Sequence, residues 1–244
     1  MRIQKDLPAQ HPAPSQNLVT TAVSPIKSLV FATNEQIRSR RIISRSRARA
    51  TGKYPSWKMG RKLHWESIYE SYAFRLLDCD PNVRWFAEQP CQIEYEANGV
   101  IRRHYPDILV EMGDRKELWE IKTTEDAEGA EVDSRTSLLQ SALPTFGYHY
   151  RIVLADELAA QPRISNAGLL LSWGRRQVPE LYRESARRFF RREGSVTWAA
   201  VCAGVLDKWG RGIVCRLVLE GALSVDMHSV IAPETVFHAR KGLV

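Results

Sequence analysis

The spacing of large apolar residues predicts a helix that begins near residue 65. Four of these residues recur at intervals of four, three and four positions and so share one helical face: Trp65, Tyr69, Tyr72 and Leu76. The pattern stops at a DCDP segment, where Pro81 ends it because proline does not continue a helix. We therefore expect one amphipathic helix of about three turns.

Alternating apolar and polar positions after this helix predict two β-hairpins. In the first, Asn98-Gly99 separates two extended segments, and this dipeptide is a strong signal for a two-residue hairpin turn. The second comprises residues 107–112 and 117–122 on either side of a GDRK turn. The chain is thus predicted to form a sheet directly after the helix.

A helix near 131–145 and a β-branched, aromatic strand over 148–155 complete this part of the pattern. Helix, hairpins, helix and strand predict a compact α/β domain over residues 51–160. The first 35 residues, rich in Pro, Ser, Gln and Thr, lack sustained periodicity. We therefore predict that residues 1–50 form a basic, partly disordered N-terminal arm.

The remaining part, residues 161–244, is predicted to form a winged-helix-like domain. Three helical segments precede two extended ones, in the order 179–194, 195–210, 211–221, 222–227 and 234–239. Pro179 and Gly194 bound the first helix, and Ser195 is predicted to cap the second. Three helices followed by a small β element is the winged-helix pattern. An all-α accessory bundle is the alternative for the same helices.

Charge is concentrated near the N-terminus and indicates a polyanionic partner. Residues 1–65 carry 13 Lys and Arg against 2 acidic residues, whereas the rest of the chain has a net charge of −4. Ten of these cations lie between residues 36 and 62, where there is no acid: Arg38, Arg40, Arg41, Arg45, Arg47, Arg49, Lys53, Lys58, Arg61 and Lys62. Such a segment is expected to contact DNA phosphates, although a merely solubilising tail has the same composition.

Arg102, Arg103 and His104 are further candidates for phosphate contact, because they lie on the strand that leads into Asp107, although solvated strand charges are the alternative. The four cysteines show neither zinc-site nor disulfide-framework spacing. Residues 1–19 show no apolar core of a secretory signal, and no apolar stretch approaches the length of a membrane span. We therefore expect a cytoplasmic protein with reduced thiols and no membrane partner.

The E-x-K triplet Glu120-Ile121-Lys122 is the main candidate for a catalytic site. Because alternate residues of a strand share a face, Glu120 and Lys122 lie side by side, while Trp119 and Ile121 are predicted to face the core. Antiparallel pairing across the GDRK turn brings Asp107 next to them. Carboxylates hold Mg²⁺, the metal acidifies a bound water, and a lysine orients that water or neutralises developing charge. A surface salt bridge explains the triplet alone, but the nearby aspartate favours a site for phosphodiester hydrolysis.

A fourth member of the site is expected from the predicted helix. Glu66 and Glu70 are four residues apart and are neighbours on one helical face. Like charges at this spacing repel by some tenths of a kcal/mol. The repulsion hints that a metal or a base neutralises them.

The sequence PDILVEM…LWEIK, with a glutamate on an upstream helix, resembles the PD-(D/E)xK nuclease superfamily. The segment from Gly52 to Lys122 is similar to the TnsA family, the endonuclease subunit of heteromeric transposases. The resemblance covers most of the chain from about Arg45 and leaves out the first 40 residues. It implies an α/β fold, with a restriction-endonuclease-like nuclease domain followed by a C-terminal winged-helix domain.

The resemblance also implies roles for individual residues. Four positions carry the residue types of the family's catalytic set: Glu70, Asp107, Glu120 and Lys122. The implied ligands of Mg²⁺, for which Mn²⁺ is expected to substitute, are Glu70 (directly or through water), Asp107, Glu120 and the Ile121 carbonyl. Glu66 and Gln89 are expected to lie next to these ligands and to hold them in position, without binding the metal themselves. The implied DNA contacts are Arg45, Arg47, Arg49, Lys53, Lys58, Arg61, Lys62, Arg102 and Arg103.

The activity that the resemblance implies is cleavage of the 5′ ends of a mobile element in double-stranded DNA. A DDE transposase subunit would cut the 3′ ends, and an AAA+ ATPase regulator would contact the C-terminal region. Two alternatives remain open. One is a stand-alone phage or DNA-repair nuclease with the same site, and the other is a non-catalytic DNA-binding adaptor in which metal is irrelevant.

Overall fold

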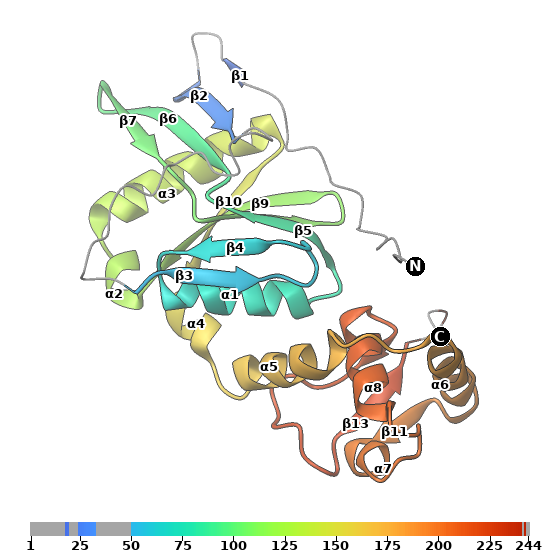
Figure 1. Cartoon of the computed structure of the whole chain (residues 1–244). Coiled ribbons are helices and arrows are strands. Elements are labelled where there is room, and N and C mark those ends of the chain that lie inside the picture. The colour runs from blue at the N-terminus through green and yellow to red at the C-terminus, as the bar shows by residue number, and fades with distance from the viewer. Residues whose placement is uncertain (1–17, 20–23, 33–49, 241, 243–244) are drawn as a thin grey trace. The chain divides into compact units, whose positions relative to one another are not determined.

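The computed structural model of this chain describes residues 18–19, 24–32, 50–240 and 242. The described residues form two compact units (Figure 1). The first comprises those up to Ser71 together with Val83–Glu157, and the second comprises Tyr72–Asn82 together with those from Leu158 onward. None of the helices in the described part of the chain is long and apolar enough to cross a membrane.

The central sheet of the first unit has the strand order β10-β9-β8-β5. Its strands are β5 (Val83–Glu88), β8 (Ile108–Met112), β9 (Arg115–Lys122) and β10 (His149–Leu154). β8 and β9 form the predicted second hairpin, in which Met112 pairs with Arg115 across a two-residue turn. β10 pairs with β9 in parallel, while the other pairs are antiparallel, so the sheet is mixed.

A second sheet has the strand order β1-β2-β6-β7. Its strands are β1 (Leu18–Val19), β2 (Ile26–Phe31), β6 (Cys91–Ala97) and β7 (Val100–His104). The predicted hairpin turn is confirmed, because Asn98 and Gly99 between β6 and β7 both have positive φ angles, 54° and 72°. Ile26–Phe31 corrects the prediction of an N-terminal arm, since this segment pairs with β6 inside the fold.

The helices predicted near residue 65 and over 131–145 are present, but the first begins at Ile68, because Trp65 belongs to a strand. The elements outside the two sheets are the hairpin β3 (Gly52–Pro55) and β4 (Lys62–Trp65), α1 (Ile68–Cys79), α2 (Thr124–Ala127), α3 (Ala130–Ala142), a 3₁₀ turn (Leu143–Phe146) and α4 (Ala155–Ala159). The first four residues of α1 belong to this unit, and the rest of the helix belongs to the second. The β3–β4 hairpin was not predicted and lies within the basic segment.

The core of the first unit joins both sheets to α3. Leu109 and Leu118 of the central sheet, Ile93 of the second sheet and Leu139 of α3 are fully buried in one apolar cluster. Leu29 of β2 belongs to the same cluster. This α/β arrangement of several sheets fits the nuclease-like fold class that the sequence predicts. It also buries the face of β9 that carries Leu118 and, two residues further along, Glu120.

The second unit contains further helices and a small sheet. They are α5 (Arg163–Gly174), α6 (Glu180–Glu193), β11 (Ser195–Thr197), α7 (Trp198–Cys202), α8 (Gly210–Leu219), β12 (Leu223–Ser224) and β13 (Val236–Ala239). The strands are antiparallel in the order β11-β13-β12. α5 packs closely on α8, because a Cβ at Gly174 would lie 2.6 Å from Leu219 Cδ1.

The predicted helix over 195–210 is corrected by the structure. Ser195 does not cap a helix but starts β11, and α7 spans only five residues. The Thr197 hydroxyl accepts a hydrogen bond from the Ala200 N–H and is the N-cap. The predicted helix ending at Gly194 is confirmed, since Gly194 closes α6 with a φ angle of 73°.

Candidate active site

Asp107 lies directly before β8 and is fixed by backbone contacts on two sides. Its N–H donates a 2.8 Å hydrogen bond to the Trp119 carbonyl, and its Oδ2 accepts a 2.7 Å bond from the Ile121 N–H. Because Ile108 pairs with Trp119, Asp107 stands opposite Glu120. The spacing predicted from the hairpin is therefore present in the structure.

Glu120 and Lys122 share one face of β9, as strand alternation predicts. Lys122 Nζ lies 2.9 Å from Glu120 Oε1. The burial of this face differs from the prediction, however, because Glu120 is 5% exposed whereas Trp119 and Ile121 are only partly buried. The expectation that Trp119 and Ile121 alone face the core is wrong.

Three further side chains surround the Glu120 carboxylate. His104 Nε2 lies 2.8 Å from Oε2, and the Tyr150 hydroxyl donates a 3.2 Å hydrogen bond to the same oxygen. Arg135 of α3 donates a 3.3 Å bond to Oε1. Sequence reasoning missed Tyr150 and Arg135, and it considered His104 only as a phosphate contact. The available signal was register, since Tyr150 stands beside Leu118 in the parallel pair and so shares the face of Glu120.

Glu70 lies in the first turn of α1 and is buried. Its Oε2 accepts a 3.0 Å hydrogen bond from the Glu66 N–H, while its own N–H donates to Ser67 Oγ at 3.2 Å. These contacts resemble a capping box and give Glu70 a structural role at the start of the helix. Burial raises the pKa of Glu70 to about 7, against the opposing effect of its hydrogen bonds.

The carboxylates of Glu70, Asp107 and Glu120 share one electrostatic environment. Burial raises the pKa of Asp107 well above its usual range, and repulsion from Glu120 and Glu70 adds to this effect. The Ile121 N–H and Lys122 act in the opposite direction. Burial also acts to raise the pKa of Glu120, but His104 and Lys122 outweigh it and lower the pKa to about 2.

This set of donors fits a hard divalent cation. Buried carboxylates that repel one another are relieved by a nearby positive charge, and Asp107 and Glu120 offer oxygen ligands beside the Ile121 backbone. Among the described residues, no group of three or more His, Cys, Asp or Glu side chains is arranged to hold a metal. Mg²⁺ commonly uses only one or two carboxylates and keeps several waters.

Gln89 and Glu66 support the site through their backbones. The Gln89 N–H donates a 2.7 Å hydrogen bond to the Asp107 carbonyl. Gln89 has a φ angle of 42°, which is uncommon for a residue other than glycine and marks a constrained position. Glu66 is partly exposed and donates its N–H to Glu70. Both residues therefore lie beside predicted site residues.

The predicted DNA-contacting residues fall into four groups. Arg45, Arg47 and Arg49 lie outside the described residues. Lys53 and Lys62 on the β3–β4 hairpin are exposed. Lys58 in the turn of this hairpin is partly buried, and the remaining candidates form ion pairs: Arg61 with Glu88, Arg102 with Glu131 and Arg103 with Glu94.

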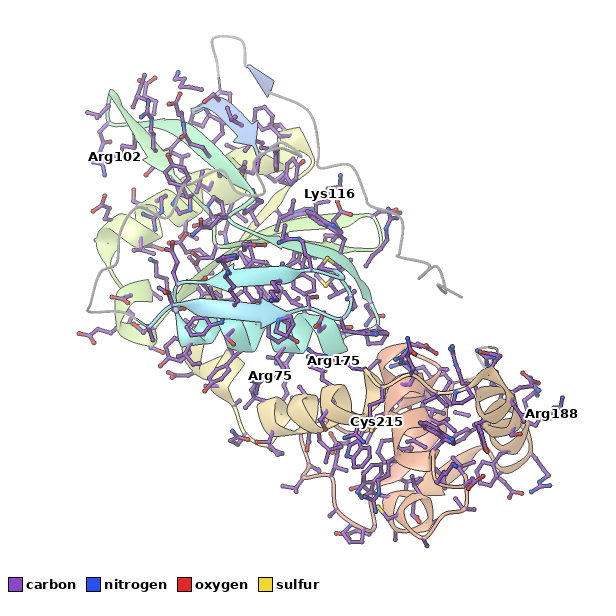
Figure 2. The ribbon with its side chains drawn as sticks, in the orientation of Figure 1. Arg75, Arg102, Lys116, Arg175, Arg188 and Cys215 are labelled. Atoms are coloured by element: carbon purple, nitrogen blue, oxygen red, sulfur yellow. The ribbon has the colours of Figure 1, made fainter. Side chains whose placement is uncertain are left out.

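Arg61 has a structural role that the sequence did not predict. Its guanidinium donates two hydrogen bonds to Glu88, at 2.9 and 2.7 Å, and Glu88 is buried. This bidentate pair fastens the β3–β4 hairpin to β5. The pair of Arg102 with Glu131 is exposed instead, at the end of the β7 hairpin (Figure 2). Exposed pairs of this kind contribute little to stability and leave Arg102 accessible.

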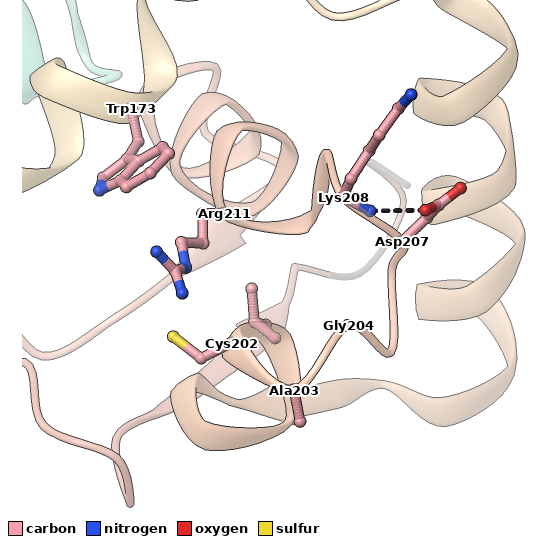
Figure 3. Close-up of a pocket in the computed structure, with 8 residues that line it drawn as sticks. Trp173, Cys202, Ala203, Gly204, Asp207, Lys208 and Arg211 are labelled. Carbon is pink, nitrogen blue, oxygen red and sulfur yellow. Dashed lines mark hydrogen bonds between the residues drawn. The ribbon is translucent and has the colours of Figure 1, made fainter.

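A separate pocket lies in the second unit and has a volume of about 230 Å³. Trp173 of α5 and Arg211 of α8 face it from one side, and the turn after α7 closes the other (Figure 3). Its acidic residue, Asp207, accepts a 2.6 Å hydrogen bond from the Lys208 N–H. Among the described residues, the lining of this pocket therefore holds no cluster of carboxylates comparable to that of the first unit.

Parts of this chain resemble known proteins. The comparison with curated proteins gives no match. Among solved structures, protein VC1899 from Vibrio cholerae shares 15% identity with a TM-score of 0.22, over 37% of this chain and 29% of that one. The match thus spans less than a third of that protein. Residues 80–158 match the family model described as TnsA-like endonuclease N terminal, which confirms over this segment the resemblance inferred from the sequence.

Proposed function

We propose that this chain is a metal-dependent DNA endonuclease that cuts the 5′ ends of a mobile element during cut-and-paste transposition. One observation carries the proposal: two carboxylates and a lysine meet at the β8–β9 hairpin inside the TnsA-like segment, and a third carboxylate, from α1, acts on the same aspartate. They are Glu70, Asp107, Glu120 and Lys122. The match covers the last three, while Glu70 precedes it.

The residues that would hold Mg²⁺ or Mn²⁺ are Asp107, Glu120, the Ile121 carbonyl and, directly or through water, Glu70. A bound divalent cation supplies Lewis acidity, which stabilises charge on phosphate oxygens and acidifies a water. The hydrogen bond from the Ile121 N–H to Asp107 keeps the aspartate and this backbone in a fixed relation. Paired backbone rather than a flexible loop therefore holds Asp107 beside Ile121.

Lys122 is the group proposed to orient the attacking water. Its side chain is 28% exposed, so it is accessible from solvent while it stays beside Glu120. Attack in line with the leaving oxygen would break the phosphodiester bond to give a 5′-phosphate and a 3′-hydroxyl. A positive charge near the phosphate would also stabilise the transition state.

Double-stranded DNA at a transposon end is the proposed substrate. Lys53 and Lys62 are exposed on the β3–β4 hairpin, and Arg102 and Arg103 lie on the strand that leads into Asp107. These cations would contact phosphates on either side of the scissile bond. We further propose that the chain acts in the cytoplasm on nucleoid DNA.

The second unit is proposed to be a winged-helix domain that contacts an AAA+ ATPase regulator. The order helix, strand, helix, helix, strand, strand from α6 to β13, with an antiparallel three-stranded sheet, supports this fold. A DDE transposase subunit is the proposed partner that cuts the opposite strand at each end.

A nicking assay tests the proposed function. A labelled duplex that carries a transposon end is incubated with Mg²⁺, with and without the cognate transposase, and with wild-type protein, Asp107→Ala or Asp114→Ala. Asp114 is exposed in the turn of the same hairpin and serves as the matched control. We expect 5′-end product from the wild type and Asp114→Ala, and none from Asp107→Ala.

Other outcomes of this assay identify the alternatives. Equal product from the wild type and Asp107→Ala would remove the proposed site. Absence of product from the wild type in the presence of its partners would favour a non-catalytic DNA-binding adaptor. Efficient cleavage of any duplex without the transposase would favour a stand-alone nuclease.

A further inference from the structure

Every acceptor position of the Glu120 carboxylate is occupied by a protein donor. Oε2 lies 2.8 Å from His104 Nε2 and 3.2 Å from the Tyr150 hydroxyl. Oε1 lies 2.9 Å from Lys122 Nζ and 3.3 Å from Arg135 Nη2. A carboxylate has about four lone-pair sites. A cation could therefore bind Glu120 only where one of these donors gives way.

The two oxygens of Glu120 have different surroundings. Oε2 faces two buried side chains, and the Tyr150 hydroxyl also lies 3.0 Å from His104 Nε2, so the three groups form a closed triangle. Oε1 faces two cations that keep some contact with solvent: the Lys122 side chain is 28% exposed and that of Arg135 16%. Exchange of a donor is thus easier at Oε1 than at Oε2.

Of the two cations at Oε1, Arg135 makes the longer contact with Glu120, and it also interacts with the Tyr150 hydroxyl. Its bond to Oε1 is 0.4 Å longer than that of Lys122. Its Nε is buried without a hydrogen-bond partner among the described residues, which is unfavourable for a charged donor. Arg135 also comes from α3, whereas Lys122 is on the same strand as Glu120. Movement of Arg135 would therefore leave the E-x-K pair intact.

We propose that Tyr150 and His104 are positioning residues that anchor Oε2 of Glu120, and that Arg135 occupies Oε1 as a counter-cation until a divalent cation displaces it. This inference rests on the proposed function, because it assigns roles around the same site. It explains why the described carboxylates are not arranged as a ready metal site while their chemistry suits one. The two roles have opposite consequences for metal affinity.

Isothermal titration of Mn²⁺ into the full-length, DNA-free protein measures these consequences. We expect Tyr150→Phe to raise the Kd by about tenfold or more, as loss of a hydrogen bond to a ligand does. We expect Arg135→Gln to lower the Kd by at least roughly threefold, because a positive charge that opposes the metal is removed. Arg135→Lys keeps the charge and should stay closer to the wild type.

Tyr148→Phe is the matched control for Tyr150→Phe. Tyr148 is also buried, but its ring lies 5.0 Å from that of Phe31 and it makes no contact with Glu120 among those that the structure describes. Loss of the Tyr148 hydroxyl should leave the Kd for Mn²⁺ unchanged. Thermal unfolding of each variant checks that the fold is kept, and Arg135→Met, which also removes the charge, takes the place of Arg135→Gln if that variant fails to fold.

The outcomes separate this inference from the proposed function. Absence of Mn²⁺ binding in the wild type, or equal binding by Asp107→Ala, would remove the metal site and this inference together. Binding that depends on Asp107 but is unchanged by Tyr150→Phe, or weakened by Arg135→Gln, would overturn the inference alone.

Discussion

The Ile121 N–H donates a 2.7 Å hydrogen bond to Asp107 Oδ2, so the aspartate before β8 is attached to the residue between Glu120 and Lys122. This bond extends the register of the β8–β9 hairpin by one position, beyond the pair of Ile108 with Trp119. A slip of one residue would turn Glu120 to the opposite face of the sheet. The pairing of the strands therefore sets the geometry of the site.

The two helical acids are predicted to differ in their effect on cleavage. Glu70→Gln removes a charge that acts directly on Asp107 but keeps an oxygen that can accept the Glu66 N–H. We expect it to lose at least about a hundredfold in rate, as loss of a key electrostatic group can. Glu66→Gln should lose much less, because Glu66 reaches the site through its backbone. Single-turnover nicking with Mg²⁺ measures both rates.

The opposite ranking of these two variants would show that Glu66 is the catalytic acid. Thermal unfolding of Glu70→Gln provides the control, because a damaged capping box would lower stability as well as rate. A slow but fully folded Glu70→Gln variant would separate the catalytic role from the capping role.

Glu70 should also make the stability of the metal-free protein depend on pH. Its pKa rises from the usual 4.5 to about 7 on folding. The folded state therefore binds the proton more tightly, so the contribution of Glu70 is fully present below pH 4.5 and is lost as the pH rises through about 7. Relative to Glu70→Gln, the wild type should lose on the order of 3 kcal/mol across this window.

Unfolding midpoints of the two proteins in the presence of a chelator, measured from pH 4 to pH 8, check this expectation. The quantity of interest is the change in their difference, because a constant offset reflects the substitution itself. A difference that stays constant with pH would mean that Glu70 titrates near its ordinary pKa in the folded protein.

Local patterns were sufficient for the β6–β7 and β8–β9 hairpins and for the pairing of Asp107 with the E-x-K triplet, but not for the β3–β4 hairpin. They could not show which face of β9 is covered, because Leu139 and Arg135 come from α3, which follows in sequence. They also missed β2. A register shift between Ile26 and Ser28 breaks the alternation that would have marked this segment as a strand.

The helix α5 was missed for a related reason. Asn166 interrupts its apolar pattern, yet the residue is buried, and its amide donates to the Met227 and Ser229 carbonyls. Its Oδ1 accepts from the Ile231 N–H. A polar residue that is satisfied by a distant segment gives no local signal of a helix.

Arg61 is predicted to contribute to stability more than to DNA binding. Arg61→Ala would leave the buried Glu88 carboxylate without its bidentate ion pair, which typically costs roughly 3–5 kcal/mol. Lys62→Ala, at an exposed neighbouring position, should change stability by at most about 0.5 kcal/mol. Urea unfolding of both variants measures the difference, and Glu88→Gln added to Arg61→Ala should recover part of it. If Arg61→Ala and Lys62→Ala were equally stable and lost DNA affinity equally, Arg61 would instead be a phosphate contact.

Leu29 tests whether β2 is an integral part of the first unit. Leu29 is fully buried, pairs with Ile93 and belongs to the core cluster, so Leu29→Ala should lower the free energy of unfolding by about 2–5 kcal/mol. The adjacent Val30 is 38% exposed and provides the matched control, because Val30→Ala removes apolar atoms from the same strand at little cost. Chemical denaturation followed by far-UV circular dichroism measures both. If the two variants were equally stable, β2 would not pack in the core, and the segment would behave as the arm that composition alone suggests.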